Sequence, residues 1–343
     1  MKITSAAEIC RSRAENLKMR ERDFAESLGI TEAQLLAAHI GYGVTRIQSH
    51  PDQIIPLAVA LGEVMALTRN PSCVNERVGV YANYRAGAHV CSVIADEIDL
   101  RIYPKHWCFA FLVEKEIEDG IRRSVQIFDA AGDAVHKIFL RETSELGAFV
   151  EAKLDLAHED QSETIQVTER SPVDGPRADA TKRGALIAGW DGMADTHQFK
   201  GIMRALDMNR LGAYRLVGTP RVRLLAPESV NVALAAIHDC DVEIMIFSGN
   251  DGCLQIYGGA IDSLKPMGLW QNVLDARFNM HLRLDHITEV YEVQKPSKNG
   301  MIRSVEAFDA EGRTILQIFA RGAANRDAWY GIIEQLESLQ AAA

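Results

Sequence analysis

The chain has 343 residues, of which 47% are hydrophobic and 24% are charged, a balance typical of a globular protein of about two domain lengths. Its formal net charge of −10 argues against nucleic acid or an anionic membrane as a partner, because both would repel it. The N-terminus has no signal-peptide core, and no run approaches the roughly eighteen apolar residues that span a bilayer, so we expect a cytoplasmic protein that is not inserted in a membrane. The six cysteines are scattered without a C-x-x-C pair, which argues against a zinc site or a disulfide framework.

Residues 4–40 are predicted to form two helices joined by a turn at 28–31. Thr31 followed by Gln34 has the pattern of a capping box, which marks the start of the second helix. This hairpin superficially resembles part of a helix-turn-helix, but the helix that would read DNA, at 32–38, is acidic and apolar where basic or amide side chains are needed. We therefore expect a packing helical hairpin.

From about residue 44 to 141 the sequence changes to short segments rich in Val, Ile, Phe and Tyr, which predict strands. The strand-like segments are 64–69, 77–84, 100–103, 107–114 and 124–129. Gly120 and Gly132 lie in tight turns, and strands joined by tight turns form antiparallel sheets. Residues 142–157 are predicted to be helical. The Pro, Gly, Ser and Asp content of 158–194 predicts a linker, with Trp190 fixing its far end to a domain.

The segment 195–210 places a lone histidine, His197, at the start of an amphipathic helix that Asp195 or Thr196 could cap. The buried stripe of this helix would consist of Phe199, Ile202, Met203 and Leu206. An imidazole in such a place can reach an iron in an apolar pocket. From the spacing alone an ordinary surface or core histidine is the better interpretation, because one residue does not define a metal site.

The second half of the sequence repeats the first. Residues 121–141 align without gaps on 301–321, and ten of the 21 positions are identical, against roughly one expected by chance. The same offset of 180 pairs several positions outside this segment, so we predict a tandem duplication: a first repeat at 1–157, a linker at 158–194 and a second repeat at 195–343. Positions kept in both repeats, such as Phe128 and Phe308, are explained by folding. In the helical hairpins the offset is 178, which sets His197 opposite Met19, so the candidate ligand exists in one repeat only.

Four stretches then resemble a known family. They are L-R-I-Y-P-K-H-W at 100–107, H-Q-F at 197–199, D-H-I-T-E-V-Y-E-V-Q-K-P at 285–296 and S-V-E-A-F-D-A-E-G at 304–312. Together they are similar to the HemS/ChuS-type haemin-degrading factors, cytoplasmic haem-uptake proteins of Gram-negative bacteria, and the resemblance covers almost the whole chain. It implies an α+β fold in which each half is a large twisted antiparallel sheet flanked by helices, with one haem in a pocket of the second half.

The resemblance also implies roles for individual residues. His197 matches the axial ligand of the haem iron, and Arg101 matches an arginine of the first half on the distal face. The positions that match polar residues around the propionates or the rim are Arg210, Lys295 and Gln317. The aromatic wall positions are Tyr103 and Phe247. Phe319 stands at a further haem-contacting position where the family often has a tyrosine, so a phenol hydrogen bond near the haem would be missing. The chemistry is sensible, because a neutral imidazole is a good axial donor and cationic side chains offset carboxylates.

Several of these residues also fit roles that involve no haem. Arg101 could be a solvent-facing charge on a strand, and Lys295, next to a proline, could be a solvated hairpin end. His106 and His286 occupy equivalent places in both repeats, which favours a structural role. Asn75 stands about where some family members carry a histidine proposed as a first-half ligand, so a second haem site is less expected.

Two functions share this predicted site. The first is an enzyme that opens the haem macrocycle with oxygen or peroxide and an external reductant, with Arg101 as distal hydrogen-bond donor. The alternative is a non-catalytic carrier that takes haem from the inner-membrane import machinery and delivers it to a separate haem oxygenase. A duplicated scaffold that binds another protein or an apolar ligand is a third class. The sequence does not separate the first two.

Overall fold

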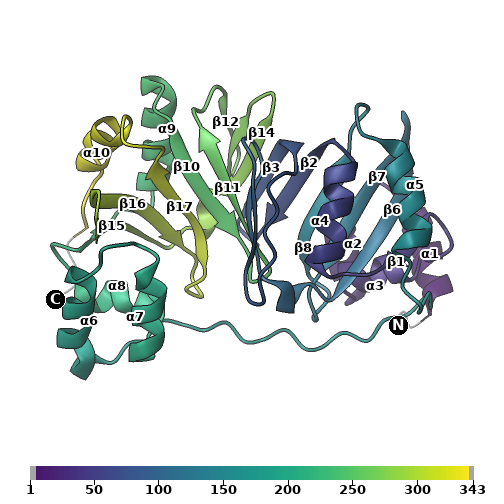
Figure 1. Ribbon diagram of the computed structural model, residues 1–343, viewed down its shortest axis with the longest axis horizontal. Helices are drawn as coiled ribbons and strands as arrows, with labels where there is room; N and C mark the ends of the chain where they lie inside the picture. The colour runs from purple at the N-terminus through teal and green to yellow at the C-terminus, as the bar shows by residue number, and fades with distance from the viewer. Residues whose placement is uncertain (1–4, 340–343) are drawn as a thin grey trace. The chain divides into compact units, whose positions relative to one another are not determined.

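The computed structural model describes residues 5–339, and within them it confirms the α+β class (Figure 1). Two large antiparallel sheets are formed, one of nine strands in the order β1-β6-β7-β8-β2-β3-β14-β13-β12 and one of eight in the order β4-β5-β11-β10-β17-β16-β15-β9. The chain divides into two compact units. Unit 1 comprises the residues up to Arg69, Asn75–Ser171 and Gly249–Gln255; unit 2 comprises Asn70–Val74, Pro172–Ser248 and the residues from Ile256 onward.

The first repeat contains five α-helices in the described part of the chain. They are α1 (Ala6–Glu15), α2 (Glu21–Leu28), α3 (Glu32–Ala37), α4 (Pro51–Ala60) and α5 (Leu146–Asp155). Its strands are β1 (Val44–Ile47), β2 (Glu63–Arg69), β3 (Cys73–Val80), β4 (Cys91–Ile94), β5 (Asp99–Ile102), β6 (Phe109–Ile117), β7 (Gly120–Phe128) and β8 (Ala134–Leu140). Side chains alternate across β6: Leu112 packs with α4 and α5, whereas Phe111 packs with α3 on the opposite face.

The N-terminal prediction of two helices was wrong, because three helices form between residues 6 and 37. The extra break follows α1. There the buried Arg13 donates hydrogen bonds to the carbonyls of Asn16 (2.7 Å) and Met19 (2.9 Å), which have no partner within a helix. The predicted turn and capping box are confirmed: Gly29 is left-handed and Thr31 and Gln34 cap α3 reciprocally.

Two further helices lie where none was predicted. Helix α4 interrupts the region predicted as strands, because His50 caps it, Pro51 fits its first turn, and a short apolar run reads equally well as helix or strand. Helix α6 (Arg183–Asp191) lies inside the range 158–194, which was predicted as a linker. Within this range, residues 158–179 form no helix or strand. Trp190 does anchor this segment: it is buried, and its indole N–H donates to the Gln294 carbonyl at 2.8 Å.

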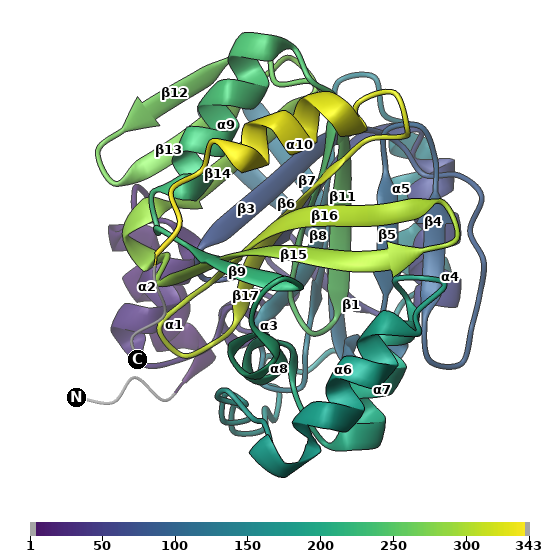
Figure 2. The ribbon, with the colours of Figure 1, turned by 90° about the vertical axis from the view of Figure 1, so that its left-hand side faces the viewer.

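The second repeat follows the same plan. Its remaining helices are α7 (Gln198–Leu206), α8 (Arg210–Val217), α9 (Ser229–Cys240) and α10 (Arg326–Glu334). Its strands are β9 (Val222–Leu225), β10 (Ile244–Gly249), β11 (Cys253–Gly259), β12 (Leu264–Met267), β13 (Trp270–Leu274), β14 (Phe278–Arg283), β15 (Glu289–Ser297), β16 (Gly300–Phe308) and β17 (Thr314–Ala320). Figure 2 shows α9 and α10 on one side of strands β15–β17 and α6–α8 on the other. The two faces of these strands therefore belong to two separate apolar clusters.

Residues retained in both repeats have structural roles, as predicted. Phe128 and Phe308 are fully buried. Asn250 donates to the carbonyls of Arg69 and Val135, both at 2.9 Å, and accepts from two following backbone N–H groups, thereby holding the segment Gly249–Gln255 in unit 1. Its repeat mate Asn70 holds an equivalent turn in unit 2. An asparagine is needed at both places because it supplies donors and an acceptor at once.

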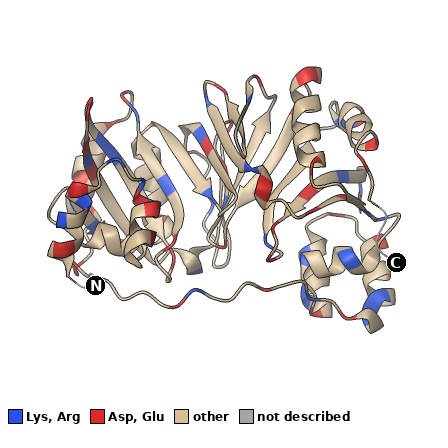
Figure 3. Cartoon of the chain, turned by 180° about the vertical axis from the view of Figure 1, so that it is seen from behind, with Lys and Arg blue, Asp and Glu red and all other residues tan. Residues whose placement is uncertain are grey.

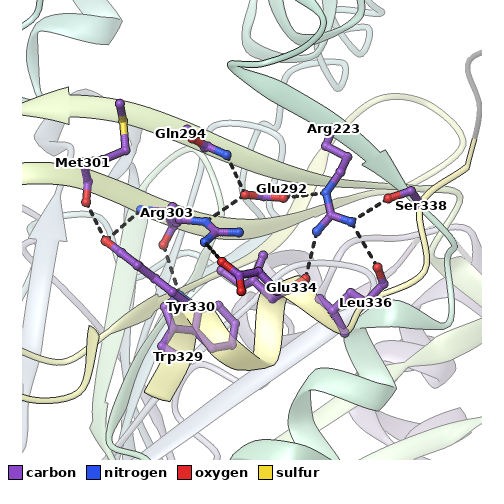
Figure 4. Close-up of polar contacts among 11 residues, drawn as sticks. Arg223, Glu292, Gln294, Met301, Arg303, Trp329, Tyr330, Glu334, Leu336 and Ser338 are labelled. Carbon is purple, nitrogen blue, oxygen red and sulfur yellow. Dashed lines mark hydrogen bonds and ion pairs between the residues drawn. The ribbon is translucent and has the colours of Figure 1, made fainter. Parts of the chain in front are cut away.

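An ion network centred on the buried Glu292 fixes α10 to the sheet of unit 2 (Figure 4). Glu292, on β15, accepts from Arg223 at 2.6 Å and from Arg303 at 2.8 Å. Arg303 also pairs with Glu334 on α10 at 3.0 Å. Arg223 donates to carbonyls at and beyond the last turn of α10, those of Ile333 and Leu336. The arginine thus satisfies carbonyl groups that the end of a helix leaves free.

Unit 1 contains a buried polar cluster that predicts acid sensitivity. His136 makes a hydrogen bond at each ring nitrogen, Nδ1 with the Thr68 hydroxyl (2.8 Å) and Nε2 with the Tyr81 hydroxyl (2.6 Å). Burial lowers the pKa of His136 to about 3. Because the unfolded chain binds this proton more readily, the stability contributed by neutral His136 is complete above about pH 6.5 and is lost as the pH falls toward 3, on the order of 4 kcal/mol in total.

Urea unfolding between pH 7 and pH 4 checks this prediction. A double variant, His136→Leu with Tyr81→Phe, takes leucine from the equivalent place in the second repeat, Leu316, and removes the hydroxyl that would lose its partner. We expect a shallower decline in the variant. An equally steep decline in both proteins would assign the acid sensitivity to other groups.

Candidate functional site

The turn before α7 holds His197 in a defined orientation, at the helix start where the sequence predicted it. The side chain of Gln198 accepts backbone N–H groups of Ala194 (2.8 Å) and Asp195 (3.1 Å). Asp195 Oδ1 in turn accepts from the backbone N–H of His197 (2.8 Å) and lies 2.6 Å from its ring Nδ1. Hydrogen bonds from the backbone and ring of His197 lower the pKa of Asp195.

This geometry leaves one ring nitrogen available. A carboxylate only accepts, so its contact with Nδ1 favours the tautomer protonated there, with the Nε2 lone pair free. The His197 side chain is 93% exposed. Pairing of one imidazole nitrogen with a carboxylate while the other faces outward is the usual arrangement of a metal-binding histidine.

A buried ion cluster lies between α8 and the sheet, centred on Glu306 of β16. Its carboxylate, fully buried, accepts from Arg210 (2.8 Å), Lys295 (3.0 Å) and the Tyr214 hydroxyl (2.8 Å). Phe199 of α7 covers the cluster, with Lys295 Nζ 4.7 Å and Arg210 Cζ 5.5 Å from its ring centroid. Two predicted polar site residues are therefore brought together by a carboxylate that the sequence analysis did not identify.

The charges in this cluster do not cancel. Burial would raise the pKa of Glu306, but Lys295 and Arg210 outweigh it and hold that pKa at about 2. Burial lowers the pKa of Lys295 to about 8 despite the attraction of Glu306. The Lys295 side chain is 5% exposed, so the alternative of a solvated hairpin end was wrong. Arg210, 34% exposed, is the cation of the pair that faces solvent. Two cations and one carboxylate leave an excess positive charge suited to an anionic ligand group.

An apolar wall continues from this cluster across β17 and β10. In the sheet register Gln317 lies opposite both Glu306 and Phe247, and Phe319 lies opposite Met245. The rings of Phe247 and Phe319 are 5.0 Å apart at 62°, and both are half-buried on the face that also carries Glu306. Three of the predicted site residues, Phe247, Gln317 and Phe319, thus lie side by side.

Two hollows lie along this part of unit 2. One, of about 150 Å³, is lined by residues that include Phe319, Met245 and Tyr330; the other, of about 260 Å³, includes Asp195 and Thr196 beside His197. Ile302 and Arg326 line both. Each is smaller than the roughly 300–1,000 Å³ clefts that enclose small-molecule ligands, so neither hollow encloses such a ligand by itself.

Arg101 and Tyr103 belong to unit 1. Arg101 lies on β5, donates to the carboxylate of Asp99 and to the Leu100 carbonyl (3.0 Å), and is 32% exposed. Tyr103 follows the same strand, and its backbone N–H donates to the Gly252 carbonyl at 3.0 Å. His286, for which a structural role was predicted, contacts the Ser72 hydroxyl through Nδ1 at 3.0 Å.

The first repeat lacks the features of this site at the equivalent positions. Met19 stands where the second repeat has His197, and Lys137 stands where it has Gln317. Lys137 is buried and pairs with Glu32 at 2.8 Å, and Glu32 also pairs with Arg69. This face of unit 1 is thus occupied by its own ion pairs.

Between residues 5 and 339 no group of three or more His, Cys, Asp or Glu residues could hold a metal ion by itself. None of the helices described is long and apolar enough to cross a membrane. On Figure 3 several Lys and Arg positions mark helices α6–α8. Helix α7 follows the turn of His197, and α8 carries Arg210 of the buried ion cluster.

Comparison with known proteins identifies the relatives of this chain. The model of the haemin-degrading HemS.ChuX domain matches twice, at residues 29–156 and 207–336. The hemin transport protein HmuS of Yersinia pestis is 32% identical over 331 residues, 95% of each chain. The structure of holo-PhuS, a heme-binding protein from Pseudomonas aeruginosa, matches with a TM-score of 0.92 and 34% identity, covering 98% of this chain and 100% of that one. ChuS, described as an E. coli heme oxygenase, matches with a TM-score of 0.85 and 27% identity over 95% of this chain and 98% of that one.

Proposed function

Because the chain belongs to the haemin-degrading HemS.ChuX domain family, we propose that it binds haem through His197 and degrades it oxidatively, releasing iron. The observation that carries this proposal is the gathering in unit 2 of an oriented, exposed imidazole, an excess of buried cationic charge and an aromatic wall. A haem presents an iron, two carboxylates and two apolar faces, and each of these three features suits one of them.

Each residue has a separate task in this proposal. His197 donates its Nε2 lone pair to the iron. Arg210 offsets a propionate, and Lys295 adds positive charge from behind it. Phe247 and Phe319 cover apolar porphyrin surface. Gln317, which lies between Phe247 and Glu306 in the sheet register, offers its amide at the rim. Since the first repeat has Met19 in place of His197 and its own ion pairs on the equivalent face, we propose one haem per chain.

Asp195 should act as a positioning residue for His197. The Asp195 carboxylate orients the ring and strengthens it as a donor to iron. Asp195→Ala removes this carboxylate, so we expect haemin to bind about tenfold to a hundredfold more weakly. The ferric/ferrous potential of bound haem should also rise, because a less basic imidazole stabilises ferric iron less. Asp195→Asn, which keeps an acceptor oxygen but not the charge, should give intermediate values. Unchanged potentials in both variants would contradict this role.

Degradation and transport are separated by one experiment. The haemin complex is mixed with ascorbate in air, with catalase present to remove free peroxide. Loss of the Soret band and release of iron support degradation, and slower loss in Arg101→Ala would support the distal role that the resemblance implies for Arg101. Tyr103→Phe tests the neighbouring wall position in the same assay.

A carrier is the second candidate function, because one relative is described as a hemin transport protein and another as a heme oxygenase. A Soret band that persists with ascorbate but drains into an added haem oxygenase would favour it. In either case we propose a cytoplasmic location, with the inner-membrane haem import machinery as the source of haem.

A further inference from the structure

We propose that the outer face of α4 and α5 is a docking surface for a protein partner that presents an apolar helix flanked by Lys and Arg. This surface, the apolar stripe, consists of Val59, Leu146, Val150 and Leu154, whose residues are 47%, 43%, 51% and 84% exposed. Large apolar side chains gathered on one exposed face are characteristic of interaction sites, whereas single ones are not. This proposal does not rest on haem binding.

The spacing of the stripe suits a helical partner. Leu146, Val150 and Leu154 follow each other at intervals of four along α5, so they form one ridge about 12 Å long on the helix surface. The Glu145 N–H donates to the Leu61 carbonyl at 3.0 Å, which places the end of α4, with Val59, beside the start of α5. In Figure 1 the two helices lie side by side on the same face of the strands of unit 1. A ridge of this kind packs into the groove along another amphipathic helix.

The second repeat supplies an internal control for this face. At an offset of 180 the core-facing residue of α5, Phe149, becomes Trp329 of α10, and both are fully buried. The outward positions instead become polar. In the order of the stripe they are Asp239, Arg326, Tyr330 and Glu334.

Three of these polar counterparts make contacts within unit 2, and Figure 4 shows those of Tyr330 and Glu334. Glu334 pairs with Arg303, and the Tyr330 hydroxyl donates to the Met301 carbonyl and lies 3.3 Å from the Arg303 N–H. Arg326 donates to the Asn299 carbonyl at 2.7 Å. The same helix on the same scaffold therefore folds with polar residues outward. Because folding does not require the apolar stripe, a role outside folding accounts for it.

The charges around the stripe determine the kind of partner. The exposed carboxylates bordering it on α5 and the preceding turn are Glu142, Glu145, Glu151 and Asp155, against one exposed cation there, Arg141. The nearby cations are turned to other groups: Lys153 pairs with Glu114, and Arg141 lies 3.4 Å from Glu63. An acidic rim favours a basic partner. It disfavours an anionic membrane, and it disfavours a second copy of this chain, because a twofold contact would oppose carboxylates with carboxylates.

The test compares the full chain with a variant that carries the second-repeat residues, Leu146→Arg, Val150→Tyr and Leu154→Glu, a set that leaves the net charge unchanged. The probe is a fluorescein-labelled 14-residue amphipathic helix of leucine and lysine, followed by fluorescence anisotropy. We expect saturable one-to-one binding to the wild type and a loss of affinity of about tenfold or more in the variant, because three apolar side chains no longer become buried. Glu145→Gln with Glu151→Gln should weaken binding and flatten its dependence on salt.

Two controls keep the test decisive. Val232→Asp on α9 removes an exposed valine outside the stripe and should leave peptide binding unchanged. If the triple variant fails to fold, Leu154→Glu alone, at the most exposed position, carries the comparison. Equal binding by wild type and variant would overturn the proposal. So would a stripe-dependent dimer in sedimentation velocity, or stripe-dependent flotation with phosphatidylcholine/phosphatidylglycerol vesicles, since each would assign the surface to a different occupant.

Discussion

Glu306→Ala is expected to destabilise unit 2 by about 3–5 kcal/mol, because it leaves two cations uncompensated beside a buried hydroxyl. The carboxylate is fully buried and is shared by Arg210, Lys295 and Tyr214. The loss in folding free energy should exceed the net contribution of the ion pairs. Either the remaining cations must stay desolvated without a counter-charge, or Lys295 must lose its proton. Urea unfolding at pH 7 measures the difference.

Two comparisons support the interpretation of that result. Glu311→Gln removes a carboxylate that is 57% exposed and lies 3.3 Å from Arg313, so it should change stability by less than about 1 kcal/mol. Raising the pH toward the ordinary pKa of lysine should reduce the penalty of Glu306→Ala, because the folded variant can then release the proton of Lys295 at a smaller cost. A penalty no larger than that of Glu311→Gln would show that the buried cluster does not depend on Glu306.

His197→Ala is expected to weaken haemin binding by about a hundredfold or more, because it removes the axial donor and not merely its support. Competition with apomyoglobin gives the dissociation rate of haemin from wild type and variant. His89→Ala, which removes an exposed histidine of the first repeat, should leave that rate unchanged. Equal rates for wild type and His197→Ala would show that His197 is not the axial ligand. They would not test the roles of the buried ion cluster and the aromatic wall.

The repeated architecture could be predicted from the sequence because its signals are local and occur twice. Phe128 and Gly132 recur as Phe308 and Gly312. In both repeats the phenylalanine is buried and the glycine adopts the left-handed conformation of a turn. Helix α4 was missed because ten residues with a short apolar run satisfy the pattern of a strand as well as that of a helix.

The candidate site was only partly visible in the sequence, and for a physical reason. Lys295 looked exposed because it precedes a proline, yet β15 continues through that proline to Ser297 and the lysine faces the core. Glu306 occupies an inward position on β16, where a carboxylate is normally excluded. A buried charge is stable only with partners, and its partners Arg210 and Lys295 come from α8 and β15, so no spacing rule connects them. The one available signal was the difference between Glu306 and its repeat mate Gln126.

The central claim is that one haem binds per chain through His197. Its most direct test is an absorption titration of the purified full chain with haemin, followed at the Soret band, beside His197→Ala. We predict a sharp break at one haemin per chain for the wild type and a shifted or missing band for the variant. A break at two haemins, or identical spectra for the two proteins, would contradict the claim.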